Sequence, residues 1–243
     1  MKPFLTVFIP AYNEEANLAH CVEVVHLKMA EHKIACEILI IDDGSRDGTG
    51  ALADELAAGW GGVRTLHHPH NLGIGEAFVT ALSQAQGEWL ILIPADLALE
   101  PGELCRYIDA APQADVVVGL RSDRSDYTLL RRLISWTNIH LIQTLFGMKL
   151  RQFQYISMYK LEVLRGMQIE YAGSAFFLAE VLIKARDMGA RLVEVEIRYA
   201  PRLSGKPTGA KLKLVVNTVI DIFRFWLHWM PARADILYGH KIT

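Results

Sequence analysis

The sequence predicts an α/β fold, a mostly parallel β-sheet with helices on both of its faces. Short apolar runs rich in β-branched residues alternate with segments in which apolar residues recur at helical spacing. The short runs are apolar almost throughout, which is typical of parallel strands that are covered on both faces. They predict strands at residues 4–9, 36–42, 63–68, 88–93, 114–119 and 191–200.

The segments between these runs predict helices, and the last helix ends the chain. Helical spacing is found at residues 14–31, 46–58, 74–86, 101–110 and, over a longer stretch, 125–147. We expect one domain over residues 1–205. We expect a separate C-terminal part over residues 206–243, which consists of a basic loop and an amphipathic helix.

The composition excludes several classes of protein. With 51% hydrophobic and 21% charged residues, the 243-residue chain is a folded protein. Its formal net charge of −2 argues against nucleic acid as a partner, because phosphate binding requires a basic surface. Three cysteines without a C-x-x-C pair indicate buried thiols in a reducing compartment. Because no signal peptide or membrane-spanning stretch is found, we expect the catalytic face to be cytoplasmic.

Two acids end the second predicted strand. In "IDDGSRDGTG", residues 41–50, Asp42 and Asp43 lie at the edge of the sheet where ligands of parallel sheets bind. Carboxylates there can accept hydrogen bonds from the N–H groups of a base or the hydroxyls of a ribose. The alternative, an Asp/Gly turn with a helix cap, explains Ser45 or Asp47 but not two acids at the strand end. We therefore favour a ligand site.

Two neighbouring segments have less specific patterns. "NLGIGEAF", residues 71–78, has Gly73 and Gly75 but lacks the third glycine of a dinucleotide-binding motif. It predicts close backbone approach at a helix N-terminus, a place suited to a nucleotide. "HHPH", residues 67–70, is interpreted as a solvated loop rather than a metal site, because its spacing offers no tetrahedral ligand set.

A single acid, Asp96, follows the apolar strand in "LILIPADLALEP", residues 90–101. A partner carboxylate is expected two positions earlier if a metal-bound phosphate lies there, but Pro94 occupies that position. Mg²⁺ commonly uses one or two carboxylates together with substrate phosphates and water. We expect Asp96 to be the single protein ligand of a Mg²⁺ or Mn²⁺ ion that arrives with the substrate. The alternative is a structural Asp in a turn.

Taken together, "IPAYNEEANL", "IDDGSRDGTG", "NLGIGEAF", "PAD" and "VVVGLRS" occur in the order and spacing of family 2 glycosyltransferases with the GT-A fold. The chain most resembles the dolichyl-phosphate mannosyltransferase-like branch, over residues 4–206. The resemblance implies an inverting enzyme that transfers a sugar from a GDP- or UDP-sugar donor to a polyprenyl or dolichyl phosphate.

The resemblance also implies roles for individual residues. The base and ribose pocket would be lined by Pro10, Ala11, Tyr12, Glu14, Asp42 and Asp43, with Asn71 and Gly73 nearby. Asp96 would be the last acid of the D-x-D metal motif, and Glu180 fits an acidic position of the branch. Groups near the phosphates or the acceptor would be Arg121, Arg131, Ser135, Arg202 and Lys206. Such cations stabilise the charge that develops on a leaving diphosphate, although ordinary surface salt bridges are the commoner fate of an arginine.

Two further departures from the family pattern bear on the acceptor. In "RQFQYISMYK", residues 151–160, a usual acid is absent, and "YAGSAFFLAE", residues 171–180, lacks the Glu-Asp pair of enzymes that act on hydroxyls. A hydroxyl acceptor needs a general base, whereas a phosphate is already an anionic nucleophile. The missing pair therefore favours a polyprenyl phosphate.

The C-terminal segment "KLKLVVNTVIDIFRFWLHWM", residues 211–230, has a wide apolar stripe at helical spacing, with Trp226, Trp229 and preceding lysines. Such a helix suits a membrane interface, and packing on the protein core is an equal alternative. We expect a peripheral association with the membrane surface.

Other functions remain open. They are transfer to a sugar hydroxyl in polysaccharide assembly, nucleotide-sugar binding with degraded catalysis and, less favoured, NAD-dependent oxidation. The second is suggested by Pro94 and by the acid missing near residues 151–153. The sugar, the base and the oligomeric state are not encoded in these motifs.

Overall fold

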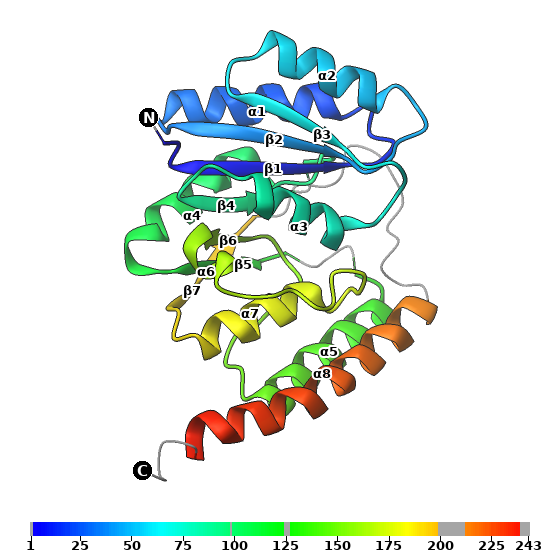
Figure 1. The fold of residues 1–243 in the computed structure, drawn as a ribbon, viewed down its shortest axis with the longest axis vertical. Coiled ribbons are helices and arrows are strands. Elements are labelled where there is room, and N and C mark those ends of the chain that lie inside the picture. Colours follow the sequence, from blue (N-terminus) through cyan, green and yellow to red (C-terminus); the bar gives the residue numbers. More distant parts are fainter. Residues whose placement is uncertain (1, 98, 124–126, 199–211, 239–243) are drawn as a thin grey trace.

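A computed structural model describes residues 2–97, 99–123, 127–198 and 212–238. They contain a seven-stranded sheet with the order β3-β2-β1-β4-β6-β5-β7 (Figure 1). All strands are parallel except β6, which runs antiparallel to β4 and β5. The strands are β1 Leu5–Ala11, β2 Cys36–Asp42, β3 Val63–His67, β4 Trp89–Leu92, β5 Val116–Arg121, β6 Ser157–Lys160 and β7 Leu192–Ile197.

Helices connect most of the strands. They are α1 Leu18–Glu31, α2 Thr49–Gly59, α3 Ile74–Gln84, α4 Leu104–Ala110, α5 Leu129–Phe146, α6 Leu161–Arg165, α7 Phe177–Asp187 and α8 Leu212–Tyr238, with 3₁₀ helices η1 Pro101–Glu103 and η2 Ala111–Gln113. The predicted strands and helices are present within a few residues of their expected bounds, except that α8 continues past the predicted end at residue 230 to Tyr238. Three elements were not predicted: β6, α6 and α7. β6 and α6 have four and five residues, too few for a periodic pattern to stand out.

The sheet is covered on both faces, which confirms the predicted fold class. Alternate strand residues point to opposite faces, so Val7 and Ile9 lie in one hydrophobic core and Phe8 lies in the other. The first core is completed by α1, α2 and α4, and the second by α3, α5, α6, α7 and α8.

Helices α5 and α8 pack side by side, at the end of the molecule opposite α2 (Figure 1). One face of α8 belongs to the second core, where Phe225 contacts the rings of Phe146 and Phe176. Much of the predicted apolar stripe lies outside the core, and its exposed members are Val216, Val219, Ile220, Phe223, Leu227 and Met230. The expected packing on the core is therefore confirmed for one face of the helix, and association of the exposed apolar face with a membrane stays a prediction. Of the helices in the described ranges, none has the length and hydropathy required to cross a bilayer.

Candidate active site

The carboxyl ends of the parallel strands bring most of the predicted site residues to one edge of the sheet. Across this edge, β2 ends in Asp42, β1 ends in Ala11, β4 leads into Asp96 and β5 ends in Arg121. The order of the strands therefore separates two carboxylates at one side from the arginine at the other. This separation of negative from positive charge suits a ligand that has a polar, uncharged group at one end and an anionic group in its middle.

The loops that follow β1 and β2 are joined by hydrogen bonds. The backbone N–H of Asn13 donates to Ser45 Oγ at 3.0 Å, and the N–H of Arg46 donates to Asn13 Oδ1 at 2.9 Å. One residue further, the N–H of Glu14 donates to Thr49 Oγ1 at 2.8 Å. Asn13 has a positive φ of 55°, a conformation that Asn tolerates better than most residues. These contacts hold the adjacent Tyr12, whose side chain is exposed, at the rim of the site.

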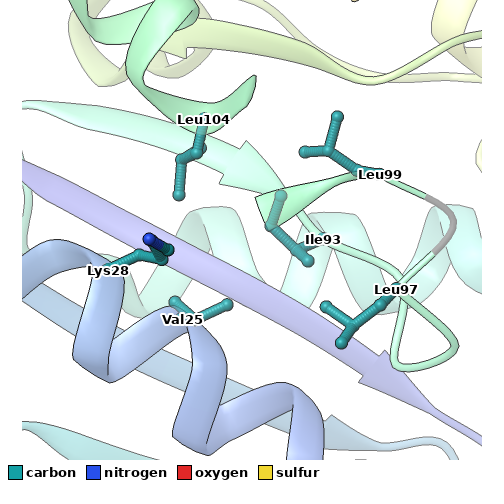
Figure 2. A pocket seen from close by; sticks show the side chains of 6 residues that line it. All are labelled: Val25, Lys28, Ile93, Leu97, Leu99 and Leu104. Atoms are coloured by element: carbon teal, nitrogen blue, oxygen red, sulfur yellow. The ribbon is translucent and has the colours of Figure 1, made fainter. Parts of the chain in front are cut away.

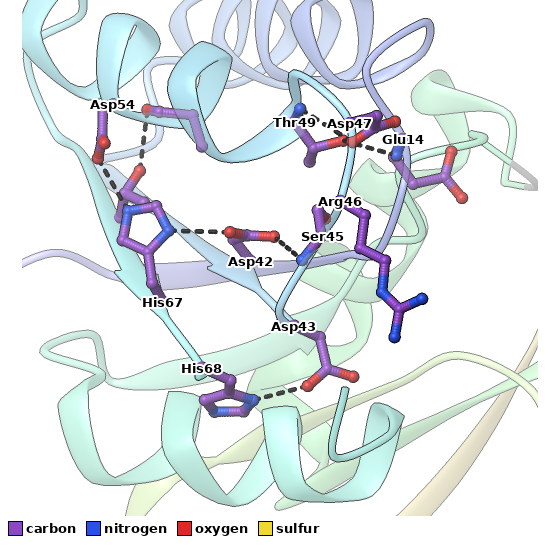
Figure 3. A network of polar contacts seen from close by, with 12 residues as sticks. Glu14, Asp42, Asp43, Ser45, Arg46, Asp47, Thr49, Asp54, His67 and His68 are labelled. Carbon is purple, nitrogen blue, oxygen red and sulfur yellow. Dashed lines mark hydrogen bonds and ion pairs between the residues drawn. The ribbon is translucent and has the colours of Figure 1, made fainter. Parts of the chain in front are cut away.

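Asp42 is held through both of its carboxylate oxygens (Figure 3). Oδ1 accepts from the backbone N–H of Ser45 at 3.0 Å, and Oδ2 lies 2.9 Å from Nδ1 of His67. Burial alone would raise the pKa of Asp42, but the hydrogen bonds from Ser45 and His67 outweigh it, and the pKa lies below its usual value. Asp42 is therefore an ionised carboxylate, which only accepts hydrogen bonds.

Asp43 joins the β2 loop to the loop before α3. Its Oδ1 accepts from the N–H of Leu72 and lies 2.7 Å from Nδ1 of His68, while Oδ2 accepts from the N–H of Gly73 at 2.8 Å. The backbone of Gly73 is therefore bound to Asp43, and its place near a nucleotide stays a prediction. The predicted Asn71 precedes these two amides and is exposed.

The interpretation of residues 67–70 as a solvated loop was wrong for His68. The side chain of His68 is only 8% exposed and bridges Asp43 and Thr80. His67 bridges Asp42 and Asp54. Strand register explains this, because Asp42 of β2 is paired with His67 of β3. The polar residues that follow each strand meet each other across the edge of the sheet, and His67 and His70 are exposed as expected.

Asp96 lies at the centre of the edge and is partly buried. The next residue, Leu97, has a φ of 50°, which is unusual for a bulky side chain and marks a sharp turn closed by the hydrogen bond from Leu97 N–H to Pro94 O. Burial, followed by the negative charges of Asp96 and Glu14, raises the pKa of Cys21 to about 12. The Cys21 thiol of α1 also donates a hydrogen bond to the carbonyl oxygen of Pro94 at 3.7 Å, which joins this turn to α1.

The described residues contain no group of three or more His, Cys, Asp or Glu side chains arranged to hold a metal ion. A single half-buried carboxylate such as Asp96 does fit a hard divalent cation that takes its other ligands from a diphosphate and water. The protein chain alone would bind such an ion weakly.

A pair of arginines lies on the other side of Asp96. The guanidinium carbon of Arg131 is 4.0 Å from the ring centre of Tyr127, and that of Arg121 is 5.0 Å from the same centre. The aromatic ring therefore brings together two predicted cations that come from β5 and α5. Ser135 follows Arg131 by one helical turn. The predicted Arg202 and Lys206 lie outside the described residues.

The predicted acidic position on α7 is occupied by a fully buried carboxylate. Glu180 accepts from the backbone N–H groups of Glu170 and Tyr171 and lies 2.7 Å from Nζ of Lys184. It orders the segment before α7, and its oxygens are directed at the protein's own groups.

A small cavity adjoins the site from the first core (Figure 2). Its volume is about 10 Å³, enough for one water molecule, and it is lined by Val25, Lys28, Ile93, Leu97, Leu99 and Leu104. This space is too small for a nucleotide.

Comparison with known proteins decides the family. The sequence model of glycosyl transferase family 2 matches residues 6–185, about three quarters of the chain. The chain belongs to glycosyl transferase family 2. The enzyme is therefore a glycosyltransferase, as the motif order predicted.

Two relatives of this family 2 enzyme act on lipid phosphates by their names. It is 28% identical to the undecaprenyl-phosphate 4-deoxy-4-formamido-L-arabinose transferase of Edwardsiella ictaluri, over 99% of this chain and 73% of the relative. It is 27% identical to the undecaprenyl-phosphate mannosyltransferase of Micrococcus luteus, over 94% of this chain and 97% of the relative.

The fold is shared with a solved glycosyltransferase. Glucosyl-3-phosphoglycerate synthase from Mycobacterium tuberculosis, in complex with Mn²⁺, UDP-glucose and phosphoglyceric acid, superposes with a TM-score of 0.69 and 18% identity. The match covers 90% of this chain and 79% of that one. The likeness confirms the predicted GT-A fold.

Proposed function

We propose that this glycosyltransferase transfers a sugar from a nucleotide donor to a polyprenyl phosphate at a membrane surface. One feature of α5 carries the proposal. Within its first two turns the helix bears Arg131 and Ser135 together with exposed apolar side chains, namely Leu129, Leu130, Leu133 and Trp136. A single helix thus offers a cation and a hydroxyl to a phosphate, and an apolar surface to the lipid chain attached to it.

The donor nucleoside would bind at the side of the edge formed by β1 and β2. Asp42 offers an ionised carboxylate held by Ser45 and His67, and Tyr12 offers an exposed side chain on the neighbouring loop. The diphosphate would extend toward Asp96 and the arginine pair. There, Asp96 would hold a Mg²⁺ or Mn²⁺ ion, which supplies positive charge to the leaving diphosphate when bound.

The reaction needs no general base if the acceptor is a phosphate. An anionic phosphate oxygen forms the new bond to the anomeric carbon while the bond from that carbon to the nucleoside diphosphate breaks, with inversion. Arg121 and Arg131 would orient the acceptor and offset charge. The engagement of Glu180 by Glu170, Tyr171 and Lys184 supports this choice, because the acid on α7 is not directed at the open edge.

Membrane association is supported by the distribution of exposed apolar side chains. In the described part of the chain, ten of the fifteen exposed large hydrophobic side chains belong to α5 and α8. The packed pair would lie in the interface and present Arg131 to lipid phosphates. We place the enzyme at the cytoplasmic face as a peripheral protein, a location that suits its three free cysteines.

The test is turnover with a lipid acceptor. The protein is incubated with radiolabelled UDP-glucose or GDP-mannose, polyprenyl phosphate and Mn²⁺, and the label is partitioned between organic solvent and water. We expect organic-soluble product that depends on the lipid phosphate. Label in a water-soluble glycan would instead indicate a hydroxyl acceptor. Donor binding without product from a panel of nucleotide sugars would indicate degraded catalysis.

A further inference from the structure

His67 lies between two carboxylates that come from different elements. Its Nδ1 is 2.9 Å from Asp42 Oδ2 on β2, and its Nε2 is 3.0 Å from Asp54 Oδ1 on α2 (Figure 3). An ionised carboxylate only accepts hydrogen bonds, so both contacts are hydrogen bonds only if both ring nitrogens carry a proton. The geometry therefore describes an imidazolium cation held by two anions.

The neighbouring histidine has no such requirement. His68 meets Asp43 through Nδ1 at 2.7 Å and Thr80 Oγ1 through Nε2 at 2.9 Å. Because a hydroxyl can donate as well as accept, the neutral ring satisfies both contacts. Two consecutive histidines thus hold two consecutive aspartates, but only the contacts of His67 depend on a positive charge.

The contact between His67 and Asp42 is enclosed by the start of α2. A Cβ atom on Gly50 would lie 2.9 Å from Asp42 Oδ2 and 3.7 Å from Cε1 of His67. The side chain of Asp42 is 9% exposed and that of His67 is 41% exposed, so one partner is covered while the other is open to solvent protons.

We propose that His67, as an imidazolium bridging Asp42 and Asp54, is a positioning residue for donor binding. It holds Oδ2 of Asp42 while the backbone N–H of Ser45 holds Oδ1, so that the carboxylate keeps one orientation. The inference rests on the proposed function, in which Asp42 receives the nucleoside. When His67 loses its proton, it can donate to only one of the two carboxylates, and the local charge becomes more negative by one unit. Both changes weaken the binding of an anionic donor.

The direction in which the pKa of His67 is shifted sets the pH range over which the bridge carries its charge. The hydrogen bond to Asp42, and after it the one to Asp54, raises the pKa of His67. The charged bridge is therefore complete below the pKa of an unfolded histidine, about 6.5, and is lost as the pH rises through the raised value. The titratable groups that face the ring are Asp42 from β2 and Asp54 from α2.

Donor affinity measured against pH tests the proposal. The dissociation constants of UDP-glucose and GDP-mannose are measured by calorimetry on the full chain from about pH 5.5 to 8.5, the range in which histidine titrates. These donors are pyrophosphate diesters, so no phosphate of the ligand titrates there. We expect the affinity of the wild type to fall severalfold as the pH rises, and the affinity of His67→Gln to be lower by on the order of tenfold at the acidic end and independent of pH.

Asp54 provides the sharper variant because its side chain is 66% exposed and its replacement leaves the core intact. Asp54→Asn removes one anion from the bridge, so the midpoint of the affinity profile should move to lower pH. Glu55→Gln removes the same charge from the next, exposed residue of α2 and should leave the midpoint in place. The titration of the His67 ring, followed by NMR on histidine-labelled protein, should move in parallel.

The results for these variants distinguish a failure of the inference about His67 from a failure of the proposed donor site. An unchanged midpoint in Asp54→Asn, or wild-type affinity and pH dependence in His67→Gln, overturns the role of His67. If Asp42→Ala loses donor binding while those results hold, the donor site stands and only the inference about His67 fails. If Asp42→Ala binds as tightly as the wild type, the donor site itself is wrong. The Asp54 and Glu55 pair still decides the matter if His67→Gln does not fold.

Discussion

Gly75, in the first turn of α3, packs directly against the backbone carbonyl of Ala172, which precedes α7. A Cβ atom at position 75 would come within 3.0 Å of that oxygen, closer than side chains approach backbone atoms in folded proteins. The contact joins the loop that carries Gly73 to the segment ordered by Glu180. The close backbone approach expected from the G-x-G pattern is thus confirmed, and its partner is the protein's own chain.

Gly75→Ala should therefore destabilise the protein. The added methyl group forces two backbone segments apart, and such overpacking costs about 1–3 kcal/mol. Chemical denaturation followed by circular dichroism measures the change. Gly59→Ala is the matched control, because that helical glycine has no neighbouring atom within 4 Å of an added Cβ. Equal stability of the two variants would contradict the tight contact.

Asp96→Asn should remove the metal dependence of donor binding. The variant keeps the shape of the side chain but loses the charge that attracts a divalent ion. With Mn²⁺ present, we expect UDP-glucose or GDP-mannose to bind on the order of tenfold more weakly than to the wild type, a change of about 1.4 kcal/mol. With a chelator present, the two proteins should bind the donor alike. An identical response to Mn²⁺ in both proteins would make Asp96 a structural residue of the turn.

Tyr127→Leu should weaken recognition of the acceptor phosphate. The ring lies 4.0 Å from Arg131 and 5.0 Å from Arg121, and cation–π contacts contribute about 0.5–2 kcal/mol. We expect the KM for polyprenyl phosphate to rise severalfold, with a smaller effect on the KM for the donor. Tyr127→Phe keeps the ring and should behave like the wild type. A loss of equal size in both variants would assign the effect to the hydroxyl group.

Phe223→Asp and Leu227→Asp should reduce binding to lipid vesicles. Both side chains are on the exposed apolar face of α8, and burial of one such side chain is worth about 1.5–3 kcal/mol. Co-sedimentation with vesicles of anionic and neutral phospholipids measures the partition, and we expect a drop of on the order of tenfold for each variant. Leu27→Asp changes an equally exposed leucine on α1 and serves as the control. If all three variants sediment like the wild type, α8 is not a membrane surface.

Asp115→Asn should lower stability at neutral pH but not in acid. Asp115 receives hydrogen bonds from Arg191 on the β7 side and from Lys160 of β6, and these hold its pKa well below the usual range. A lowered pKa stabilises the fold above the unfolded value, about 3.9, and this contribution disappears as the pH falls through the folded value. We expect a loss of roughly 1–3 kcal/mol at pH 7. Thermal melts of both proteins should converge as the pH is lowered below about 4.

The sequence was sufficient for the elements whose patterns are local. The run over 36–42 predicted β2 with its exact bounds, because a strand covered on both faces is apolar throughout. Asp42, Asp43 and Asp96 were predicted as site residues because each ends or follows such a strand, and the order of parallel strands alone gathers them at one edge. The four-residue β6 was missed because it has no pattern of its own and pairs antiparallel between β4 and β5.

The contacts of His67 and His68 were missed for a different reason. Both histidines contact partners distant in sequence, such as Asp42, which is 25 residues from His67. A polar segment of the sequence is interpreted as a solvated loop unless the strand register is known, and here the register aligns His67 with Asp42. The sequence also did not show which face of α8 packs on the core, because apolar residues surround most of the helix.

By itself, the sequence determined the α/β class, the family and the strand ends at which the polar residues gather. The tertiary structure decided which of those residues touch, and therefore which carry charge. The periodicity of a sequence shows only which side chains of a segment face water and which face the core. A hydrogen bond such as that between His67 and Asp42 depends instead on the register of two strands that are separated in the sequence.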